Sequence, residues 1–156
     1  MTNILVTSAV IRFAAMNLLS LREHSAKELY KKLTQKFQQE DGVTEVIQSL
    51  TAEGLQSDTR FTEAFINMRK RQGKGPLVIA MELKERGIVD ELAHRFLESN
   101  NDSWGLLAVT VRRKKFGQSL PQDAKQKAKQ IRFLSGRGFS SSNIRDALNY
   151  TDEYDE

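Results

Sequence analysis

Apolar residues recur every three or four positions along most of the chain, the spacing of an α-helix that buries one face. The first such stretch runs from residue 10 to residue 21. A second begins at Ser25, with Glu28 three residues later, so the two can form a capping box in which each side chain bonds the other residue's amide. Its apolar face comprises Leu29, Leu33 and Phe37. Gly42 then breaks the pattern, and a third helix ends at Gly54. The apolar positions of this third helix are Val46, Ile47 and Leu50.

A similar order of three helices follows in the middle of the chain. Asp58 is expected to be the N-cap of the first helix. The apolar positions of that helix are Phe61, Phe65 and Met68. After the interruption at residues 73–75, a second helix should start at Pro76, because the first turn of a helix does not need the amide that proline lacks. Its buried face comprises Ile79, Ala80 and Leu83. Gly87 stops it, and residues 90–98 form the third helix.

The last third of the chain has the same organisation. Residues 104–116 include a stretch of strand-like composition at 107–111, but their apolar side chains share one helical face, so we predict a helix. Pro121 lies near the start of the second helix, which ends at the glycines of 136–138. Its predicted apolar stripe is Ala124, Ala128, Ile131 and Leu134. Residues 140–142 cap a final helix. Its apolar positions are Ile144, Ala147 and Leu148.

The three groups of helices align best on a glycine followed by an apolar residue. These glycines are Gly42, Gly87 and Gly138, which are 45 and 51 residues apart. Recurrence of similar chemistry at this period is typical of repeat proteins. We therefore predict an all-α protein of three tandem three-helix, helix-turn-helix-like repeats. They occupy residues 1–56, 57–100 and 101–150, and an acidic tail follows at 151–156. Because one such repeat is too small for a sizeable core, neighbouring repeats should share apolar contacts in an elongated, curved array.

Composition narrows the class of protein. The 156 residues include no cysteine, which excludes disulfides, iron–sulfur clusters and thiolate zinc sites. The N-terminal residues lack the basic region and cleavage site of a signal peptide, and no apolar run approaches the roughly 18 residues that span a bilayer. We expect a soluble cytoplasmic monomer that makes no contact with membranes.

Catalytic chemistry is missing from the sequence. His24 and His94 are the only histidines, and no nucleophile or general base has recognisable partners. His94 and Glu98, one helical turn apart, could bind a metal or form a surface pair, and we favour the surface pair because no third ligand is in view. We predict a non-enzymatic protein with no catalytic residue, no metal site and no cofactor.

Positive charge gathers in the last third of the chain. The net charge is +4, yet residues 104–150 hold 10 Lys and Arg against 2 acids, and residues 151–156 hold 4 acids. Such a basic field attracts anionic partners, nucleic acid included. Three groups are the binding candidates: Arg69, Lys70, Arg71 and Lys74; Arg112, Arg113, Lys114 and Lys115; and Lys125, Lys129 and Arg132.

Each basic group also has a structural reading. The first two lie near predicted helix ends, where cations are favoured by the helix macrodipole. Within the second, Arg112 and Lys115 are expected to share a face. The third forms one stripe, with Asp123 as its nearest acid, so sparse self-pairing favours a partner. Aromatic interleaving is poor, so bound DNA should be held weakly through its phosphates, with strong salt dependence and little sequence preference.

Four segments, in order, resemble the RecX family of regulatory proteins. They are residues 22–33, 53–61, 75–88, and 114–117 with 132–139. The first segment contains REHSAKEL and KL, and the second is EGLQSDTRF. The third begins with GP and ends with ELKERGI, with Ile79 between them, and the fourth contains KKFG, RFL and RGF. One departure is Gln56-Ser57, where the family more often has an apolar residue followed by Asp.

The resemblance implies three tandem three-helix units. It also implies function: family members bind the RecA filament on DNA, lodge in its helical groove, and inhibit strand exchange, ATP hydrolysis and co-protease activity in DNA repair and the SOS response. The alternative is a sequence-nonspecific DNA-binding helical repeat protein that acts without RecA.

Overall fold

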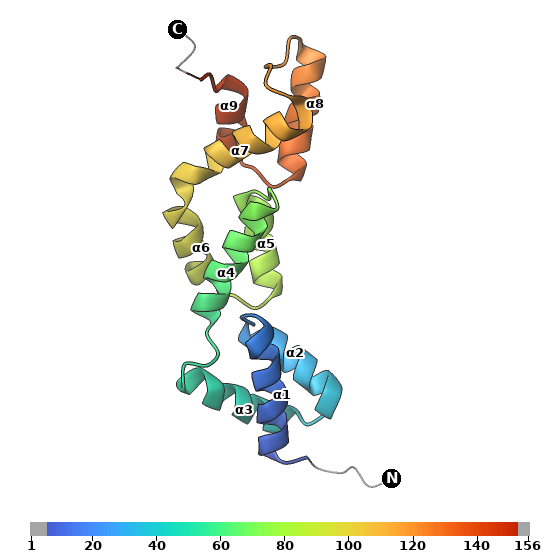
Figure 1. The fold of residues 1–156 in the computed structure, drawn as a ribbon, viewed down its shortest axis with the longest axis vertical. Helices are drawn as coiled ribbons and strands as arrows, with labels where there is room; N and C mark the ends of the chain where they lie inside the picture. The colour runs from blue at the N-terminus through green and yellow to red at the C-terminus, as the bar shows by residue number, and fades with distance from the viewer. Residues whose placement is uncertain (1–5, 153–156) are drawn as a thin grey trace. The chain divides into compact units, whose positions relative to one another are not determined.

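The computed structural model describes residues 6–152, and within this range the chain forms nine α-helices and no β-strand (Figure 1). The helices are α1 (Ser8–Leu21), α2 (Ala26–Phe37), α3 (Glu40–Ala52), α4 (Asp58–Arg71), α5 (Pro76–Glu85), α6 (Asp90–Ser99), α7 (Asn101–Phe116), α8 (Ala124–Gly136) and α9 (Ser141–Asn149). The prediction of an all-α chain of three-helix repeats is confirmed, including the helix over 107–111. The first five residues and residues 153–156 of the predicted acidic tail lie outside the described residues.

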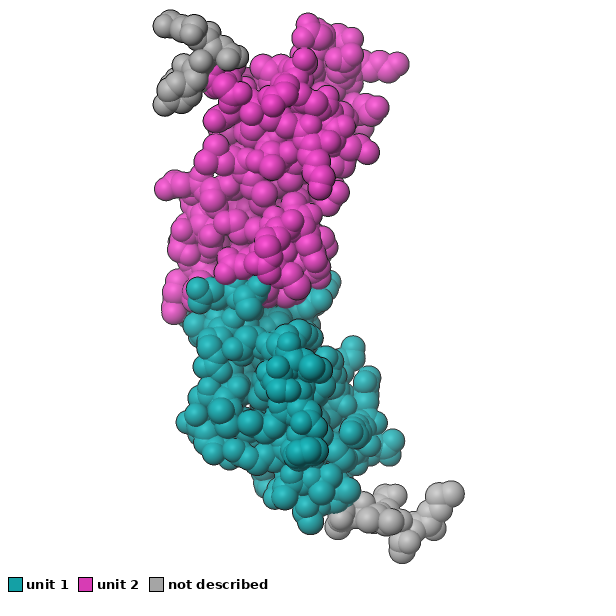
Figure 2. Space-filling model, viewed as in Figure 1, with its two compact units in different colours: residues 1–64, 83–92 teal, residues 65–82, 93–156 magenta. Residues whose placement is uncertain are grey.

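The chain divides into two compact units (Figure 2). The first comprises residues 1–64 and 83–92, and the second comprises residues 65–82 and 93–156. The helices of the middle repeat therefore contribute to both units. Each unit is described separately below.

The core of the first unit is built from one face of each of α1, α2 and α3. Its buried members are Ile11, Ala15, Leu29, Leu33, Val43, Val46, Ile47 and Leu50. The predicted capping box starts α2: the Glu28 amide donates to Ser25 Oγ and the Ser25 amide donates to Glu28 Oε1, both at 3.1 Å. Truncating one of these buried aliphatic side chains to alanine costs about 2–5 kcal/mol, so this face fixes the packing of the three helices.

The break predicted at Gly42 is wrong, because Gly42 lies inside α3. The chain turns earlier, at Gln38, which adopts a left-handed conformation with φ 54° and donates its amide to Thr34 O. A Cβ at Gly42 would lie 3.4 Å from Ile11 Cδ1, an ordinary van der Waals contact, so α3 packs on α1 at this position without requiring a glycine.

The predicted N-cap of α4 is also one residue off. Ser57 Oγ accepts the Arg60 amide at 3.1 Å, and Asp58 is the first helical residue. The Asp58 carboxylate instead accepts the Ala26 amide at 2.9 Å, and the buried Gln56 side chain donates to the same oxygen at 2.9 Å. Gln56 and Ser57 thus both take part in the start of α4. Pro76 is the first residue of α5, as predicted.

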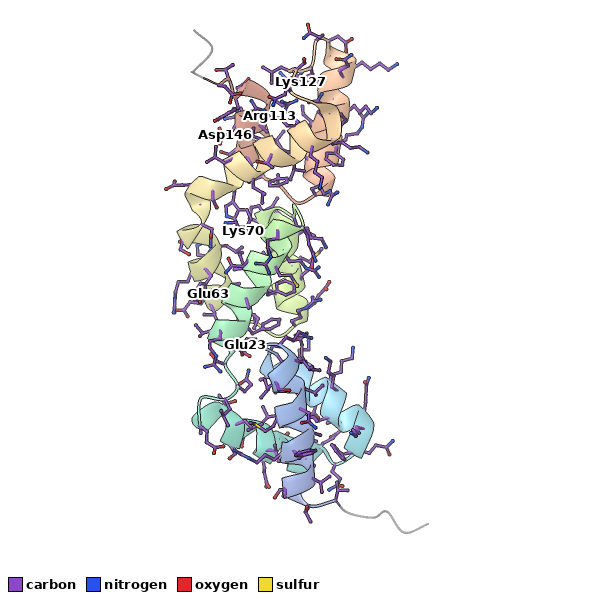
Figure 3. The ribbon with its side chains drawn as sticks, in the orientation of Figure 1. Glu23, Glu63, Lys70, Arg113, Lys127 and Asp146 are labelled. Carbon is purple, nitrogen blue, oxygen red and sulfur yellow. The ribbon has the colours of Figure 1, made fainter. Side chains whose placement is uncertain are left out.

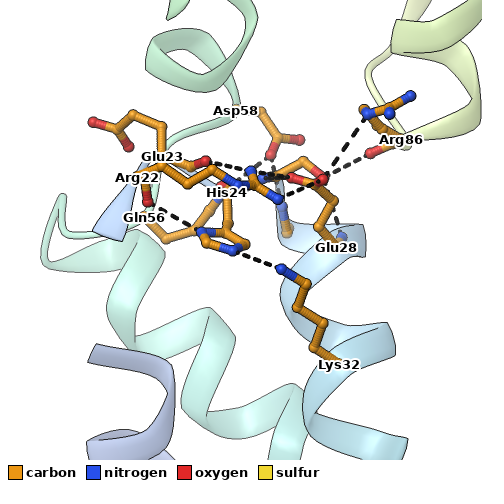
Figure 4. A network of polar contacts seen from close by, with 10 residues as sticks. Arg22, Glu23, His24, Glu28, Lys32, Gln56, Asp58 and Arg86 are labelled. Carbon is orange, nitrogen blue, oxygen red and sulfur yellow. Dashed lines mark hydrogen bonds and ion pairs between the residues drawn. The ribbon is translucent and has the colours of Figure 1, made fainter. Parts of the chain in front are cut away.

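A polar network surrounds the start of α2 (Figure 4). His24 is buried; Lys32 Nζ lies 3.0 Å from His24 Nε2, and the other ring nitrogen lies 3.0 Å from Arg22 O. This pattern fits a neutral ring that accepts from Lys32 and donates to the carbonyl. Burial lowers the pKa of His24, and the hydrogen bond to Arg22 O only partly opposes this. Burial alone would raise the pKa of Glu28, but hydrogen bonds from Arg22 and Ser25 lower it.

The start of α2 is joined to the turn between α5 and α6. The Ser25 hydroxyl donates to Arg86 O at 2.7 Å. Gly87, at φ 81°, closes this turn, and a Cβ there would lie 2.7 Å from Lys27 Cβ. The turn therefore needs a glycine both for its left-handed backbone and for the close approach of α2.

The second unit contains the equivalent joint one repeat later. The Gly75 amide donates to Arg137 O at 2.8 Å, and the Leu77 amide donates to Gly138 O at 2.9 Å. A Cβ at Gly75 would lie 2.5 Å from Gly138 O, so the two backbones touch. Ser25 and Gly75 both precede a second helix, 50 residues apart, and the receiving arginines at 86 and 137 are 51 apart. The spacing between repeats is therefore more regular at these joints, 50 and 51 residues, than at the glycines 42, 87 and 138, where it is 45 and 51 residues.

The last repeat packs α7, α8 and α9 around a second core. Its buried members are Ala108, Val109, Leu134, Phe139, Ile144, Ala147 and Leu148. The apolar stripe predicted for α8 is wrong in part, because Ala124 is exposed and Ile131 is 37% exposed. The buried face of α8 instead pairs Leu134 with the polar Gln130, one turn earlier.

Candidate functional site

The basic group at the end of α4 is largely committed to the fold. Lys70 is half-buried, and its ammonium donates to Asn100 Oδ1 at 3.0 Å and to Ser103 Oγ at 2.8 Å (Figure 3). It also lies 5.0 Å from the centre of the Trp104 ring. Burial lowers the pKa of Lys70. Lys70 thus ties α4 to the start of α7.

Two further members of this group flank the buried carboxylate of Glu82. Arg69 lies 2.6 Å from Glu82 Oε2 and Lys74 lies 3.1 Å from Oε1. Arg69 also stacks on Phe65, 4.9 Å from the ring centre. These ion pairs are partly shielded from water and hold α5 against α4. Of the predicted group, Arg71 alone has an exposed side chain.

Arg112 is a structural residue and not a surface ligand. Its side chain is fully buried and donates to Ser119 O at 3.2 Å and Gln118 O at 3.3 Å. The side-chain oxygen of Gln130, Oε1, accepts a third, longer hydrogen bond from Arg112 at 3.5 Å. Burial, followed by the neighbouring Arg113 charge, lowers the pKa of Arg112. The prediction that Arg112 and Lys115 share an exposed face is therefore wrong, because Arg112 holds the loop after α7 against α8.

Arg113 faces the end of α9. It lies 3.2 Å from Asp152 Oδ2 and 5.2 Å from the centre of the Tyr150 ring (Figure 3). Lys114 and Lys115 are exposed. The four consecutive cations thus point in different directions, as expected for a helix, and two of them are available at the surface.

The exposed cations of the first two groups meet in one groove of the second unit. Arg71, Lys114 and Lys115 line it together with Arg137, at the end of α8. Its volume is about 450 Å³, and its apolar walls are Leu107, Val111 and Phe133. No Asp or Glu is among the residues that line it. We call this surface the basic groove.

Phe133 organises two of these cations. Lys115 Nζ lies 5.6 Å and the Arg137 guanidinium 5.4 Å from the centre of its ring, while Phe116 packs edge-on at 5.4 Å. Arg137 was not predicted as a binding residue. Arg137 stands apart in the sequence from the three basic groups, so charge grouping does not mark it.

The third predicted group continues the basic groove along α8. Lys125, Lys129 and Arg132 are exposed, and within residues 6–152 no carboxylate forms an ion pair with them. Lys129 precedes Phe133 by one helical turn, so the stripe runs beside the groove. The nearest acid, Asp123, is occupied as the N-cap of α8, accepting the Gln126 amide at 2.8 Å.

This arrangement can bind an anion but has no evident reactive group. Arginine guanidinium and lysine ammonium groups beside an apolar wall suit phosphate or carboxylate oxygens. His94 forms the expected surface pair, 2.9 Å from Glu98. No group of three or more potential ligands in the described part of the chain is arranged to hold a metal ion. None of the described helices is long and apolar enough to cross a membrane.

Comparison with known proteins gives matches along almost the whole chain. Models of the first, second and third three-helix domains of RecX match residues 12–50, 57–97 and 107–148. The regulatory protein RecX of Halorhodospira halophila is 38% identical over 149 residues, which cover 96% of this chain and 92% of that protein. RecX of Pseudomonas tolaasii is 40% identical over 152 residues, covering 97% and 98%. The crystal structure of RecX from Lactobacillus salivarius superposes with a TM-score of 0.77 at 25% identity, over 90% of this chain and 94% of that one.

Proposed function

Because the chain belongs to the RecX family of regulatory proteins, we propose that it binds the RecA filament on DNA and inhibits its recombinase, ATPase and co-protease activities. We place its binding site in the helical groove of the filament and its role in DNA repair and the SOS response. The protein acts in this proposal as a cytoplasmic monomer. Family membership supports the regulatory role, and the basic groove supports the choice of an anionic partner.

The single observation that carries the proposal is the basic groove. Its four exposed cations have no lining carboxylate to neutralise them, and the stripe on α8 extends the same charge. A DNA-containing filament presents phosphates at regular spacing, so a rigid set of cations can contact several at once. Such contacts need no reactive group, which agrees with regulation by occupancy.

The repeat structure supplies the second element of the proposal. Three tandem repeats, at 1–56, 57–100 and 101–150, would offer more than one binding surface, so that the protein contacts more than one RecA protomer. Binding of this kind blocks the movements that accompany ATP hydrolysis and strand exchange. Inhibition should therefore occur with fewer regulators than RecA protomers.

The test is a titration of the protein into RecA assembled on single-stranded DNA, with ATP hydrolysis as the readout. We expect inhibition well below one molecule per RecA protomer. Unchanged hydrolysis at molar excess and low salt would refute the proposal.

The alternative is DNA binding without RecA, which the unpaired cations of α8 favour. It predicts tight binding to bare single-stranded DNA, with an affinity that falls steeply as salt increases. Binding to bare DNA that is undetectable at moderate salt would exclude it, and binding to RecA filaments under the same conditions would support regulation of the filament.

A further inference from the structure

A second groove of the second unit lies along another side of α8. The basic groove contacts α8 at Phe133 and Arg137, whereas this groove contacts it at Lys127, Ile131 and Ser135. Its other walls come from the start of α5 and from α9, and its volume is about 410 Å³. We call it the apolar groove.

The apolar groove has an exposed hydrophobic edge and a floor of core side chains. Leu77 is 60% exposed and Ile131 is 37% exposed, whereas the other apolar lining residues, Phe139, Ile144 and Leu148, are largely buried. Exposed apolar surface of this kind, rimmed by polar groups, is typical of a protein-binding site.

The apolar groove is fixed in place by the joint between repeats. The Leu77 amide donates to Gly138 O. The neighbouring Val78 side chain packs closely on Gly138, since a Cβ added to Gly138 would lie 2.6 Å from Val78 Cγ1. Phe139, directly after this glycine, is 2% exposed. A partner therefore meets a preformed surface and spends little binding free energy on ordering it.

Charge at the rim selects the kind of partner. Lys127 and Arg145 line the groove and are exposed, no Asp or Glu lines it, and no carboxylate among residues 6–152 pairs with either. An apolar side chain with a carboxylate nearby would fill the floor and neutralise the rim. Nucleic acid fits less well, because the one aromatic ring, Phe139, is buried and offers no stacking face.

We infer that the apolar groove is a docking site for a protein segment that carries an apolar side chain flanked by Asp or Glu. The inference rests on the proposed function in one respect: we assign this segment to RecA. The protein would then contact the filament on two sides of α8, with DNA phosphate at the basic groove and protein at the apolar groove.

The test compares two probes, RecA assembled on single-stranded DNA and the same DNA without RecA. The variant Leu77→Ser/Ile131→Ser removes the apolar edge without changing charge, and Lys127→Glu/Arg145→Glu reverses the rim. We expect each to weaken binding to the filament by about tenfold or more, as for side chains central to an interface. Because Leu77→Ser/Ile131→Ser keeps every charge, this variant should leave bare-DNA binding within about twofold. Leu106→Ser, an exposed apolar position of α7 outside the groove, is the matched control and should bind both probes normally.

Three results would overturn the inference. The first is a folded Leu77→Ser/Ile131→Ser variant, checked by circular dichroism, that binds the filament as wild type does. The second is an equal loss of bare-DNA binding, which would make the groove a nucleic-acid contact. The third is a wild type that dimerises through the groove while the variant stays monomeric in sedimentation. If the wild type itself does not bind the filament, the proposed function and this assignment are both refuted. The titration of wild type into RecA filaments identifies this case separately from a failure of the groove assignment alone.

Discussion

The joint between Gly75 and Gly138 should be the most sensitive backbone contact of the second unit. In Gly75→Ala, the new Cβ would lie 2.5 Å from Gly138 C, Gly138 O and Phe139 N. All three are backbone atoms, so no side chain can rotate away to relieve the overlap. Gly75 has no left-handed backbone strain of its own, since it is not among the positive-φ glycines. The effect of the substitution therefore measures the contact alone.

The expected loss of stability follows from the backbone contacts that the new Cβ forces apart. Overpacking of this kind costs about 1–3 kcal/mol. Moving the backbones apart also breaks two hydrogen bonds, Gly75 N–H to Arg137 O and Leu77 N–H to Gly138 O, at about 1 kcal/mol each. The free energy of unfolding should fall by about 3–5 kcal/mol, a large share of the roughly 5–15 kcal/mol that stabilises a typical domain.

Urea unfolding followed by circular dichroism at 222 nm measures this loss. With a typical dependence of about 2 kcal/mol per molar urea, the midpoint should fall by about 2 M. Gly136→Ala is the matched control, because Gly136 ends α8 and a Cβ there meets nothing within 4 Å. It should leave stability unchanged or raise it by up to about 1 kcal/mol. Equal stability of Gly75→Ala and Gly136→Ala would refute the assigned role of the joint.

Two further predictions concern buried polar groups. Arg112→Ala should lower the free energy of unfolding, measured by urea denaturation, by about 2–3 kcal/mol, because Gln118 O and Ser119 O lose a buried donor. The control Lys114→Ala, at an exposed position, should change it by less than about 0.5 kcal/mol. Similar losses in the two variants would contradict the structural role of Arg112. Burial lowers the pKa of His24, so the stability it contributes is present above about pH 6.5 and is lost as pH falls below that value, by at most about 1.4 kcal/mol per pH unit. His24→Asn should flatten the stability profile below about pH 6.5 relative to wild type, and a profile with the same slope as wild type would contradict this assignment.

Local signals predicted the helices well. The capping box at Ser25, the proline at the start of α5 and the apolar faces of α2 and α3 depend on residues close together in the sequence. Such interactions are formed within one helix or its first turn, so spacing alone identifies them.

Errors arose where contacts between distant residues decide the outcome. Gly42 looks like a break in the sequence, yet it lies inside α3, where it packs beside Ile11 of another helix. The buried face of α8 includes Gln130, whose polar side chain is buried in contact with Arg112. Neither fact can be read from apolar spacing, because both depend on partners elsewhere in the chain.

The candidate site was predicted in composition but not in geometry. Charge counting identified the basic groups, but it could not separate Arg69, Lys70 and Arg112, which bond within the fold, from Arg71 and Lys114, which reach the surface. The groove itself forms only when α4, α7 and α8 come together. Arg137 reaches the groove only through this packing, so charge counting along the chain missed it.

The most direct test of the central claim is inhibition of RecA ATP hydrolysis on single-stranded DNA by three forms of the protein. They are the wild type, the basic-groove variant Arg71→Glu/Lys114→Glu/Lys115→Glu, and a control with the same charge change at exposed positions outside the groove, Lys31→Glu/Lys84→Glu/Arg95→Glu. We predict that the wild type and control inhibit at the same concentration and that the folded groove variant requires at least about tenfold more, because lost phosphate contacts weaken binding strongly. Equal inhibition by all three would contradict the claim that the basic groove binds the filament.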